Sequence, residues 1–139
     1  SLSLAGIRCG SLIGHAPLVE LIGRILPPYC FPTASQDAVL RCLSAEAQTE
    51  LATRRQIIIA ERKQLADELI QLPDVLRVWP SDANFLLIET TPGSTLSARA
   101  QAGKILLRDF GWDPMLPNCI RITVGSPADN EQLLKALRS

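Results

Sequence analysis

The sequence predicts an α+β fold, in which an antiparallel sheet carries helices packed mainly on one face. Three observations support this prediction. Apolar residues recur at helical spacing over a long central segment, 44–72. Short stretches rich in β-branched and aromatic residues follow, separated by Pro, Gly, Ser and Asp, and a final segment, 127–137, is again helical in pattern. With 139 residues, 47% of them hydrophobic, the chain is long enough for one sizeable core.

The first part of the chain is expected to alternate between extended and helical structure. Residues 7–13 fit a short strand interrupted by Gly10, and Pro17 fits the first turn of a helix that the next Pro-Pro pair would end. A second helix is expected to begin with Thr33 or Ser35 as its cap. Its buried side is expected to consist of Ala38, Val39 and Cys42 or Leu43.

One long amphipathic helix is predicted for residues 44–72, with Pro73 closing it. Its apolar face consists of Leu51, Ile58, Leu65, Leu69 and Leu72. The segment has neither a heptad charge pattern nor a basic stripe, so it indicates a helix that covers a core rather than a coiled coil or a membrane-surface helix.

The second half of the chain predicts four strands and two helices. Segments 75–79 and 84–89 are expected to form an antiparallel pair, because a Pro-Ser-Asp turn separates them. A short helix over 94–102 leads to a third strand at 105–108, and 119–124 is the fourth. The 127–137 segment is the last helix.

Alternation along the fourth strand separates its side chains between two faces. Ile120, Ile122 and Val124 fall on one face, and Cys119, Arg121 and Thr123 on the other. If the aliphatic residues face the core, Arg121 points away from it.

Composition excludes several kinds of partner. Fourteen basic and fourteen acidic side chains cancel, so nucleic acid and anionic membranes are not expected as partners. The four cysteines form no C-x-x-C pair and there is one histidine, which favours reduced thiols and no metal site. No signal peptide or apolar run of membrane length is present, so a soluble, cytoplasmic chain is expected.

The most specific local motif is Gly6-Ile7-Arg8-Cys9-Gly10. Two glycines allow the backbone to approach a ligand closely while the arginine between them supplies a guanidinium, and phosphate is a natural ligand for such a segment. A turn with an ordinary surface arginine is the alternative interpretation of the motif taken alone.

Residues 4–10, Leu-Ala-Gly-Ile-Arg-Cys-Gly, resemble the segment that follows the cofactor lysine in fold-type-I aminotransferases, especially histidinol-phosphate aminotransferases. Segments 105–109 and 119–125 resemble the same family in the same order, and Asn84 lies in a further family-like segment. The resemblance implies that residues 1–30 are a remnant of the large cofactor-binding domain with a connecting helix, and that 31–139 form the small carboxy-terminal domain.

The resemblance also implies roles for three arginines and a cofactor. Arg8 would contact the phosphate of pyridoxal phosphate, and Arg121, assisted by Arg108, would bind the anionic end of the substrates. Arg108 as a surface charge and Arg121 as a structural ion-pair partner remain alternatives. No catalytic residue is assigned within the chain, because the family places its Schiff-base lysine one position before Ser1. None of the chain's own three lysines has surroundings in the sequence that suggest a lowered pKa.

The expected function is therefore that of a fragment, inactive alone, of a homodimeric histidinol-phosphate aminotransferase. Its substrates would be a phosphorylated amino compound, histidinol phosphate, and 2-oxoglutarate, in histidine biosynthesis. Alternatives are a related fold-type-I enzyme, such as an aromatic or other amino-acid aminotransferase or a threonine-phosphate decarboxylase, and a non-catalytic binding module with the same small-domain fold. Segment 110–118 departs from the family pattern, which puts the substrate preference in doubt.

Overall fold

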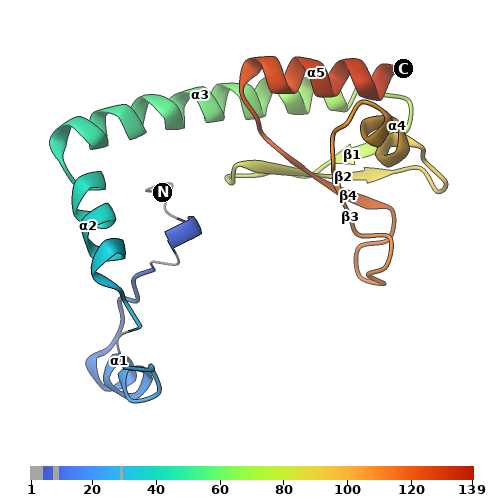
Figure 1. The fold of residues 1–139 in the computed structure, drawn as a ribbon. Coiled ribbons are helices and arrows are strands. Elements are labelled where there is room, and N and C mark those ends of the chain that lie inside the picture. The colour runs from blue at the N-terminus through green and yellow to red at the C-terminus, as the bar shows by residue number, and fades with distance from the viewer. Residues whose placement is uncertain (1–4, 8–9, 29) are drawn as a thin grey trace. The chain divides into compact units, whose positions relative to one another are not determined.

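The computed structural model describes residues 5–7, 10–28 and 30–139 (Figure 1). The chain divides into two compact units, residues 1–53 and 54–139, which are described separately. This division groups segments within the chain, and a domain boundary near residue 30 stays a prediction. Among the helices of the described ranges, none combines the length and the apolar character needed to cross a membrane.

The regular structure of the described part of the first unit is helical. It comprises the 3-10 helix η1 (Ala5–Ile7), then α1 (Ala16–Gly23) and α2 (Thr33–Cys42). Pro17 lies in the first turn of α1, as expected. Thr33 is already helical and Pro32 precedes it as the cap, so the expected cap at Thr33 or Ser35 is wrong.

Two further expectations for the first unit are also wrong. The described residues of the 7–13 segment form no strand: Ile7 ends η1 and 10–13 are irregular. A strand needs a paired neighbour, and no described segment of this unit supplies one. No residue of α2 is buried, and Ala38, Val39 and Cys42 are only half-buried.

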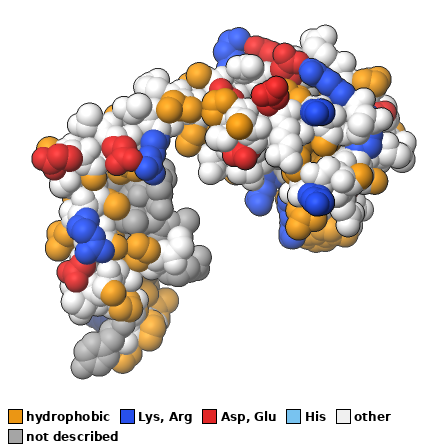
Figure 2. Space-filling view, turned by 45° about the horizontal axis from the view of Figure 1, so that its top comes forward, with side chains coloured by type: hydrophobic (Ala, Val, Ile, Leu, Met, Phe, Trp, Pro, Cys, Tyr) orange, Lys and Arg blue, Asp and Glu red, His pale blue; other side chains and the backbone are white. Residues whose placement is uncertain are grey.

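Large aliphatic side chains are exposed on the first unit, and Figure 2 shows hydrophobic side chains on its surface. The most exposed are Leu12, Ile13, Leu21, Ile25 and Leu40. Amphipathic patterns in this unit therefore predict helices correctly, yet they do not produce a closed core within it.

The long helix is confirmed as α3 (Ala45–Leu69), and it extends from the first unit into the second. In the second unit Leu65 and Leu69 are almost completely buried, and Leu72, just beyond the helix, is buried as well. Ile58 is half-buried against the same cluster. The predicted apolar face is thus the face that the core uses.

The second unit contains one four-stranded antiparallel sheet in the order β1-β2-β4-β3. Its strands are β1 (Val75–Val78), β2 (Phe85–Thr90), β3 (Arg108–Asp109) and β4 (Cys119–Thr123). The expected antiparallel pairing of the first two strands is confirmed. β4 lies between β2 and β3, and its residues Ile120 and Arg121 pair with a strand on both sides.

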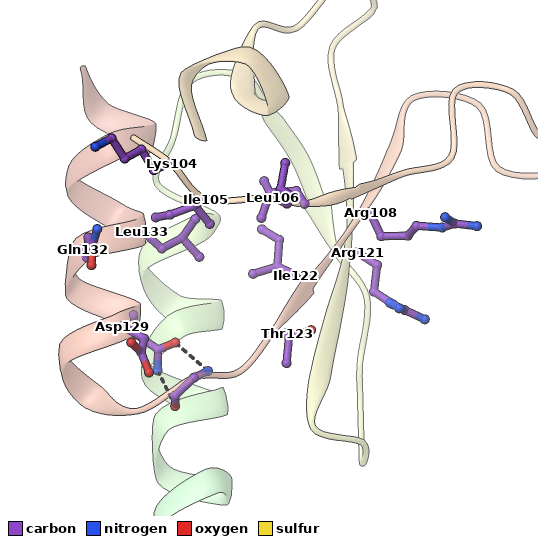
Figure 3. A pocket seen from close by; sticks show the side chains of 13 residues that line it. Lys104, Ile105, Leu106, Arg108, Arg121, Ile122, Thr123, Asp129, Gln132 and Leu133 are labelled. Atoms are coloured by element: carbon purple, nitrogen blue, oxygen red, sulfur yellow. Dashed lines mark hydrogen bonds between the residues drawn. The ribbon is translucent and has the colours of Figure 1, made fainter. Parts of the chain in front are cut away.

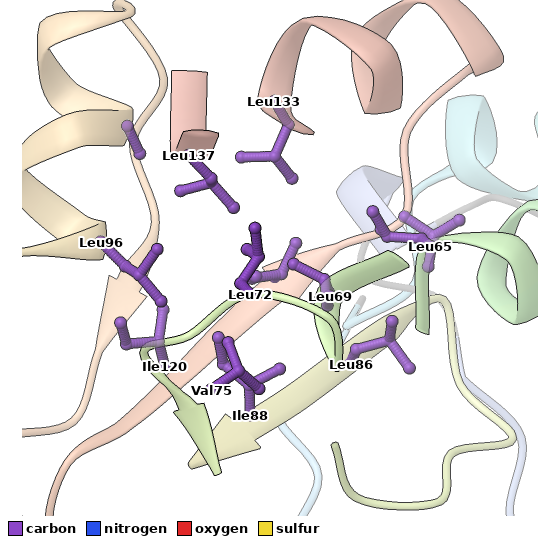
Figure 4. Close-up of a cluster of buried hydrophobic side chains, with 13 residues drawn as sticks. Leu65, Leu69, Leu72, Val75, Leu86, Ile88, Leu96, Ile120, Leu133 and Leu137 are labelled. Carbon is purple, nitrogen blue, oxygen red and sulfur yellow. The ribbon is translucent and has the colours of Figure 1, made fainter. Parts of the chain in front are cut away.

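Helices cover one face of this sheet. α4 (Leu96–Ala102) packs against α5 (Pro127–Arg138), and the end of α3 lies beside α5 on the same side of the sheet (Figure 1). Figure 4 shows the aliphatic cluster between helices and strands. Its most completely buried members are Leu65, Leu69, Ile88, Leu96, Ile122 and Leu137. The predicted α+β class, with helices on one face, is confirmed.

The third strand is shorter than expected, because residues 105–107 are irregular and only Arg108 and Asp109 pair with the sheet. Lys104 has a positive φ of 62°, and its N–H donates to the carbonyl of Gln101. The N–H of Ile105 donates to the carbonyl of Ala100 at 2.9 Å. These hydrogen bonds satisfy the last carbonyls of the helix, so the chain joins β4 only at Arg108.

A polar junction connects β4 to α5. Ser126 caps the helix in a capping box with Asp129. The buried amide of Asn130 accepts from the N–H of Gly125 at 2.9 Å and donates to its carbonyl at 3.3 Å, and it also donates to the Glu61 carboxylate at 2.8 Å. One side chain thereby joins β4, α5 and α3.

Candidate functional site

The face of the sheet opposite the helices is partly open and polar. Along β2 and β4 it carries Phe85, Leu87 and Glu89, which lie opposite Thr123, Arg121 and Cys119. On β1 a register shift between Val75 and Arg77 brings Arg77 opposite Glu89. Val75 is buried, so strict alternation would place Arg77 toward the core, and the bulge turns it to the open face instead.

Arg108 and Arg121 lie directly opposite each other on β3 and β4. Both are exposed, and Figure 3 shows both side chains pointing away from Ile122 and α5. Neither forms an ion pair with any carboxylate among the described residues. Like charges opposite each other in a sheet are unfavourable. Two uncompensated guanidinium groups in this position favour an anionic ligand, for which their planar donor forks are suited.

Each of the two arginines is close to an aromatic ring. The Cζ atom of Arg121 lies 5.3 Å from the ring centroid of Phe85, and that of Arg108 lies 5.8 Å from the centroid of Phe110. A guanidinium within about 6 Å of a ring face is attracted to it. Sequence reasoning missed both rings: Phe85 lies on a different strand from Arg121, and the spacing of two residues between Arg108 and Phe110 was the one signal that could have indicated a shared side.

A cavity of about 490 Å³ adjoins these arginines. Arg108, Arg121 and Thr123 line one part of it, and Lys104 lies on another part, next to α5 (Figure 3). Ile122 belongs to the lining at its centre. The side chains of Arg108 and Arg121 point away from Ile122 and α5, so the two guanidinium groups and the aliphatic part of the cavity face different directions.

Cys119 differs from its expected environment. Alternation places it on the face of Arg121, yet it is only 5% exposed. Burial raises the pKa of its thiol, and the carboxylate of Glu89 raises that pKa further. Cys119 is thus held as a neutral thiol, and with Cys30 and Cys42 it is one of the free cysteines of the described residues.

The other sequence-predicted residues are placed as follows. Arg8 lies outside the described residues. Gly6 and Gly10, its described neighbours in the sequence, each have open space where a side chain would begin. Asn84 precedes β2, and its backbone carbonyl accepts from the N–H of Val124 at 2.9 Å. The structure therefore brings together Arg108 and Arg121 out of the three predicted arginines.

The three lysines occupy different structural positions. Lys63 donates to Asp67 at 2.8 Å, and this hydrogen bond, together with the charge of Asp67, raises the pKa of Lys63. It is held as an ammonium, which is a poor nucleophile. Lys104 is exposed at the end of α4, and Lys135 is exposed on α5. Among the described residues, no group of three or more His, Cys, Asp or Glu side chains is arranged to hold a metal ion.

The sequence of the chain resembles a known protein family. The family model for aminotransferase class I and II matches residues 1–137 of the chain. This chain belongs to the class I and II aminotransferase family. Membership covers nearly the whole chain, so the arginines, the sheet and the covering helices all lie inside the matched region.

Relatives and solved structures agree with this membership. The histidinol-phosphate aminotransferase of Pseudoalteromonas atlantica is 36% identical over 135 residues, which cover 97% of this chain and 36% of that protein. The solved histidinol-phosphate aminotransferase of Clostridium acetobutylicum matches with a TM-score of 0.83 at 23% identity, over 98% of this chain and 41% of that one.

The same fold occurs in a decarboxylase. L-threonine-O-3-phosphate decarboxylase of Porphyromonas gingivalis matches with a TM-score of 0.72 at 22% identity, over 91% of this chain and 39% of that one. The two solved structures show the aminotransferase fold. This family member spans about two fifths of the length of the relatives that it matches.

Proposed function

We propose that this chain is part of a pyridoxal-phosphate-dependent enzyme that moves an amino group between histidinol phosphate and 2-oxoglutarate, in histidine biosynthesis. The observation that carries the proposal is the pair Arg108 and Arg121, side by side on the open face without a carboxylate partner among the described residues. Its specific substrate is suggested by the 36% identity to a histidinol-phosphate aminotransferase.

In this proposal the two arginines hold the anionic end of the substrate. Arg121 lies on the central strand β4, which is paired on both sides, so its backbone position is well fixed. A guanidinium fork can grip a carboxylate or a phosphate with two parallel hydrogen bonds, and Arg108 adds a second positive charge that suits the greater charge of phosphate. Both proposed substrates carry such groups.

Arg8 is proposed to hold the phosphate of the cofactor. The chemistry of this segment fits, because it offers a guanidinium between two glycines around which space is open. Pyridoxal phosphate, when bound, supplies the electron sink that amino transfer requires. The residues of this chain would bind and orient the two anionic groups, while the proton-transferring lysine is expected outside it.

The 139-residue chain alone is proposed to be inactive. Lys63 is held protonated by Asp67, and the family resemblance places the reactive lysine one position before Ser1. We further propose a cytoplasmic homodimer for the complete enzyme. Light scattering on the enzyme that carries this chain should give the mass of two subunits, and a single-subunit mass would contradict the homodimer.

The decisive test is an assay of the longer enzyme with histidinol phosphate and 2-oxoglutarate as substrates. We expect amino transfer, and we expect Arg121→Ala to reduce kcat/KM about tenfold to a hundredfold, because charged hydrogen bonds contribute about 1.5–3 kcal/mol. Arg77→Ala is the matched control, since Arg77 lies on the same open face but stacks on Trp79. Absence of turnover with histidinol phosphate would contradict the proposed substrate.

Two alternatives are separated by the same experiment. A related enzyme would turn over threonine phosphate or an aromatic amino acid in place of histidinol phosphate. Threonine phosphate is the more informative of these two substrates, because a threonine-phosphate decarboxylase is among the matching structures. A free-standing binding module would bind anions without any turnover. Reading the coding sequence before Ser1 tests the module directly, because the enzyme requires a lysine there.

A further inference from the structure

The two arginines of the site lean in opposite directions along the sheet. Arg121 approaches Phe85, which lies opposite Thr123, two residues after Arg121. Arg108 approaches Phe110, whose N–H donates to the carbonyl of Cys119, two residues before Arg121. Figure 3 shows the ends of the two side chains separating.

The rings give a physical reason for this arrangement. Two guanidinium groups that start from directly opposite positions repel each other. Attraction to an aromatic face offsets part of that repulsion and gives each guanidinium a preferred direction. The distance between the two charges therefore depends on the rings as well as on the strands.

Phe110 is itself held in place by the turn that begins the β3–β4 loop. Its carbonyl accepts from the N–H of Asp113 at 2.8 Å, and its ring centroid lies 6.3 Å from that of Trp112. Asp109 accepts from the N–H of Gly111 at 2.8 Å and from the hydroxyl of Ser97 on α4 at 2.8 Å. These hydrogen bonds tie the backbone around Phe110 to the turn and to α4, and so place Phe110 next to Arg108.

We propose that Phe110, backed by Trp112, is a positioning residue that holds the guanidinium of Arg108 away from that of Arg121, so that a phosphate fits between them, and thereby sets the preference of the site for phosphate over a single carboxylate. One guanidinium fork matches one carboxylate, whereas a phosphate dianion gains from a second guanidinium at a suitable distance. The inference rests on the proposed anion-binding function of the two arginines.

The test measures the affinity of the 139-residue chain for inorganic phosphate and for acetate by NMR titration. Phe110→Leu should raise the phosphate Kd about threefold to fivefold, the size expected for an exposed cation–π contact, and should change the acetate Kd less than about twofold. Phe110→Tyr keeps the aromatic face and should restore phosphate affinity. Met115→Leu, at an 84% exposed position of the same loop, is the matched control and should have no effect.

Two further measurements decide whether Phe110 acts through Arg108. In an Arg108→Ala background, Phe110→Leu should cause no additional loss of phosphate affinity. In the otherwise unchanged chain, Phe110→Leu should shift the Nε–Hε NMR signal of Arg108, which is exposed to the ring current of Phe110, and leave that of Arg121 in place. An equal loss in both backgrounds, or an Arg108 signal that does not move, would overturn the proposal.

The outcomes also distinguish this inference from the proposed function. If Arg121→Ala leaves phosphate binding unchanged, the anion site is wrong, while the Arg108 signal still reports whether Phe110 positions that side chain. If Arg121→Ala weakens binding and Phe110→Leu does not, only the role of Phe110 is wrong. Urea unfolding of each variant identifies any loss of affinity that follows from loss of the fold.

Discussion

The two faces of the sheet come from the same strands and carry opposite chemistry. On the covered face Ile88 and Ile122 are completely buried against the helices. On the open face Arg108 and Arg121 are exposed beside aromatic rings. Because neighbouring residues of a strand point to opposite faces, adjacent positions can serve stability and binding separately. Substitutions at adjacent residues of β4 should therefore have different consequences.

The largest expected effect lies on the covered face. Ile122→Ala removes a completely buried side chain from the center of the cluster and should lower the free energy of unfolding by about 2–5 kcal/mol. Urea denaturation measures this loss. Thr123→Ala, the next residue and exposed, should change stability by less than about 0.5 kcal/mol. Equal losses at the two positions would contradict the separation of the faces.

On the open face the effect should fall on binding. Arg121→Ala should weaken phosphate binding about tenfold to a hundredfold, because the charged donor fork is lost. The free energy of unfolding should change by less than about 1 kcal/mol, since an exposed cation–π contact and a repulsion with Arg108 disappear together. Isothermal titration with phosphate and urea unfolding measure the two quantities. A large loss of stability with unchanged affinity would reverse the assignment of the faces.

Gly125 lies at the junction between β4 and α5, where the backbone comes close to Asp129 of the helix. A Cβ atom at Gly125 would lie 2.7 Å from the Cβ of Asp129, so Gly125→Ala should destabilise the chain by about 1–3 kcal/mol. Thermal unfolding measures the change. Gly23→Ala is the matched control, because nothing lies within 4 Å of a Cβ atom there. If both variants unfold at the wild-type temperature, the junction tolerates movement.

The smallest effect concerns the cap of α5. Ser126→Ala should cost about 1 kcal/mol near neutral pH. Hydrogen bonds from the Ser126 side chain and backbone lower the pKa of Asp129, so this carboxylate stabilises the fold above its unfolded pKa, and the contribution is lost as pH falls through the folded pKa. The difference between wild type and Ser126→Ala should shrink below about pH 4. A difference that stays constant from neutral pH to pH 3, or the same acid dependence in Asp129→Asn, would contradict this linkage.

The sequence predicted the elements whose pattern is local. Alternation in β4 identified both the buried isoleucines and the outward direction of Arg121, and helical spacing identified α3 through Leu65 and Leu69. Capping chemistry at Ser126 and Pro127 agrees with the predicted start of the last helix. In each case the residue's own neighbours along the chain determine its direction.

Features that depend on distant segments were not predictable in this way. The bulge that turns Arg77 to the open face depends on its pairing with β2. The burial of Cys119 depends on the packing of segments around it, which alternation along β4 does not show. Periodicity alone carries no information on these contacts.

The amide of Asn130 has a consequence for how this sequence can vary. Its NH₂ group donates to the Glu61 carboxylate and to the carbonyl of Gly125, and its oxygen accepts from the N–H of Gly125. These three hydrogen bonds determine which way the amide is oriented. An aspartate at position 130 would place two carboxylates at hydrogen-bond distance without a donor between them. Positions 61 and 130 are therefore expected to covary: an acidic residue at one excludes an acidic residue at the other. Related sequences in which both are commonly acidic would show that this junction is built differently among them.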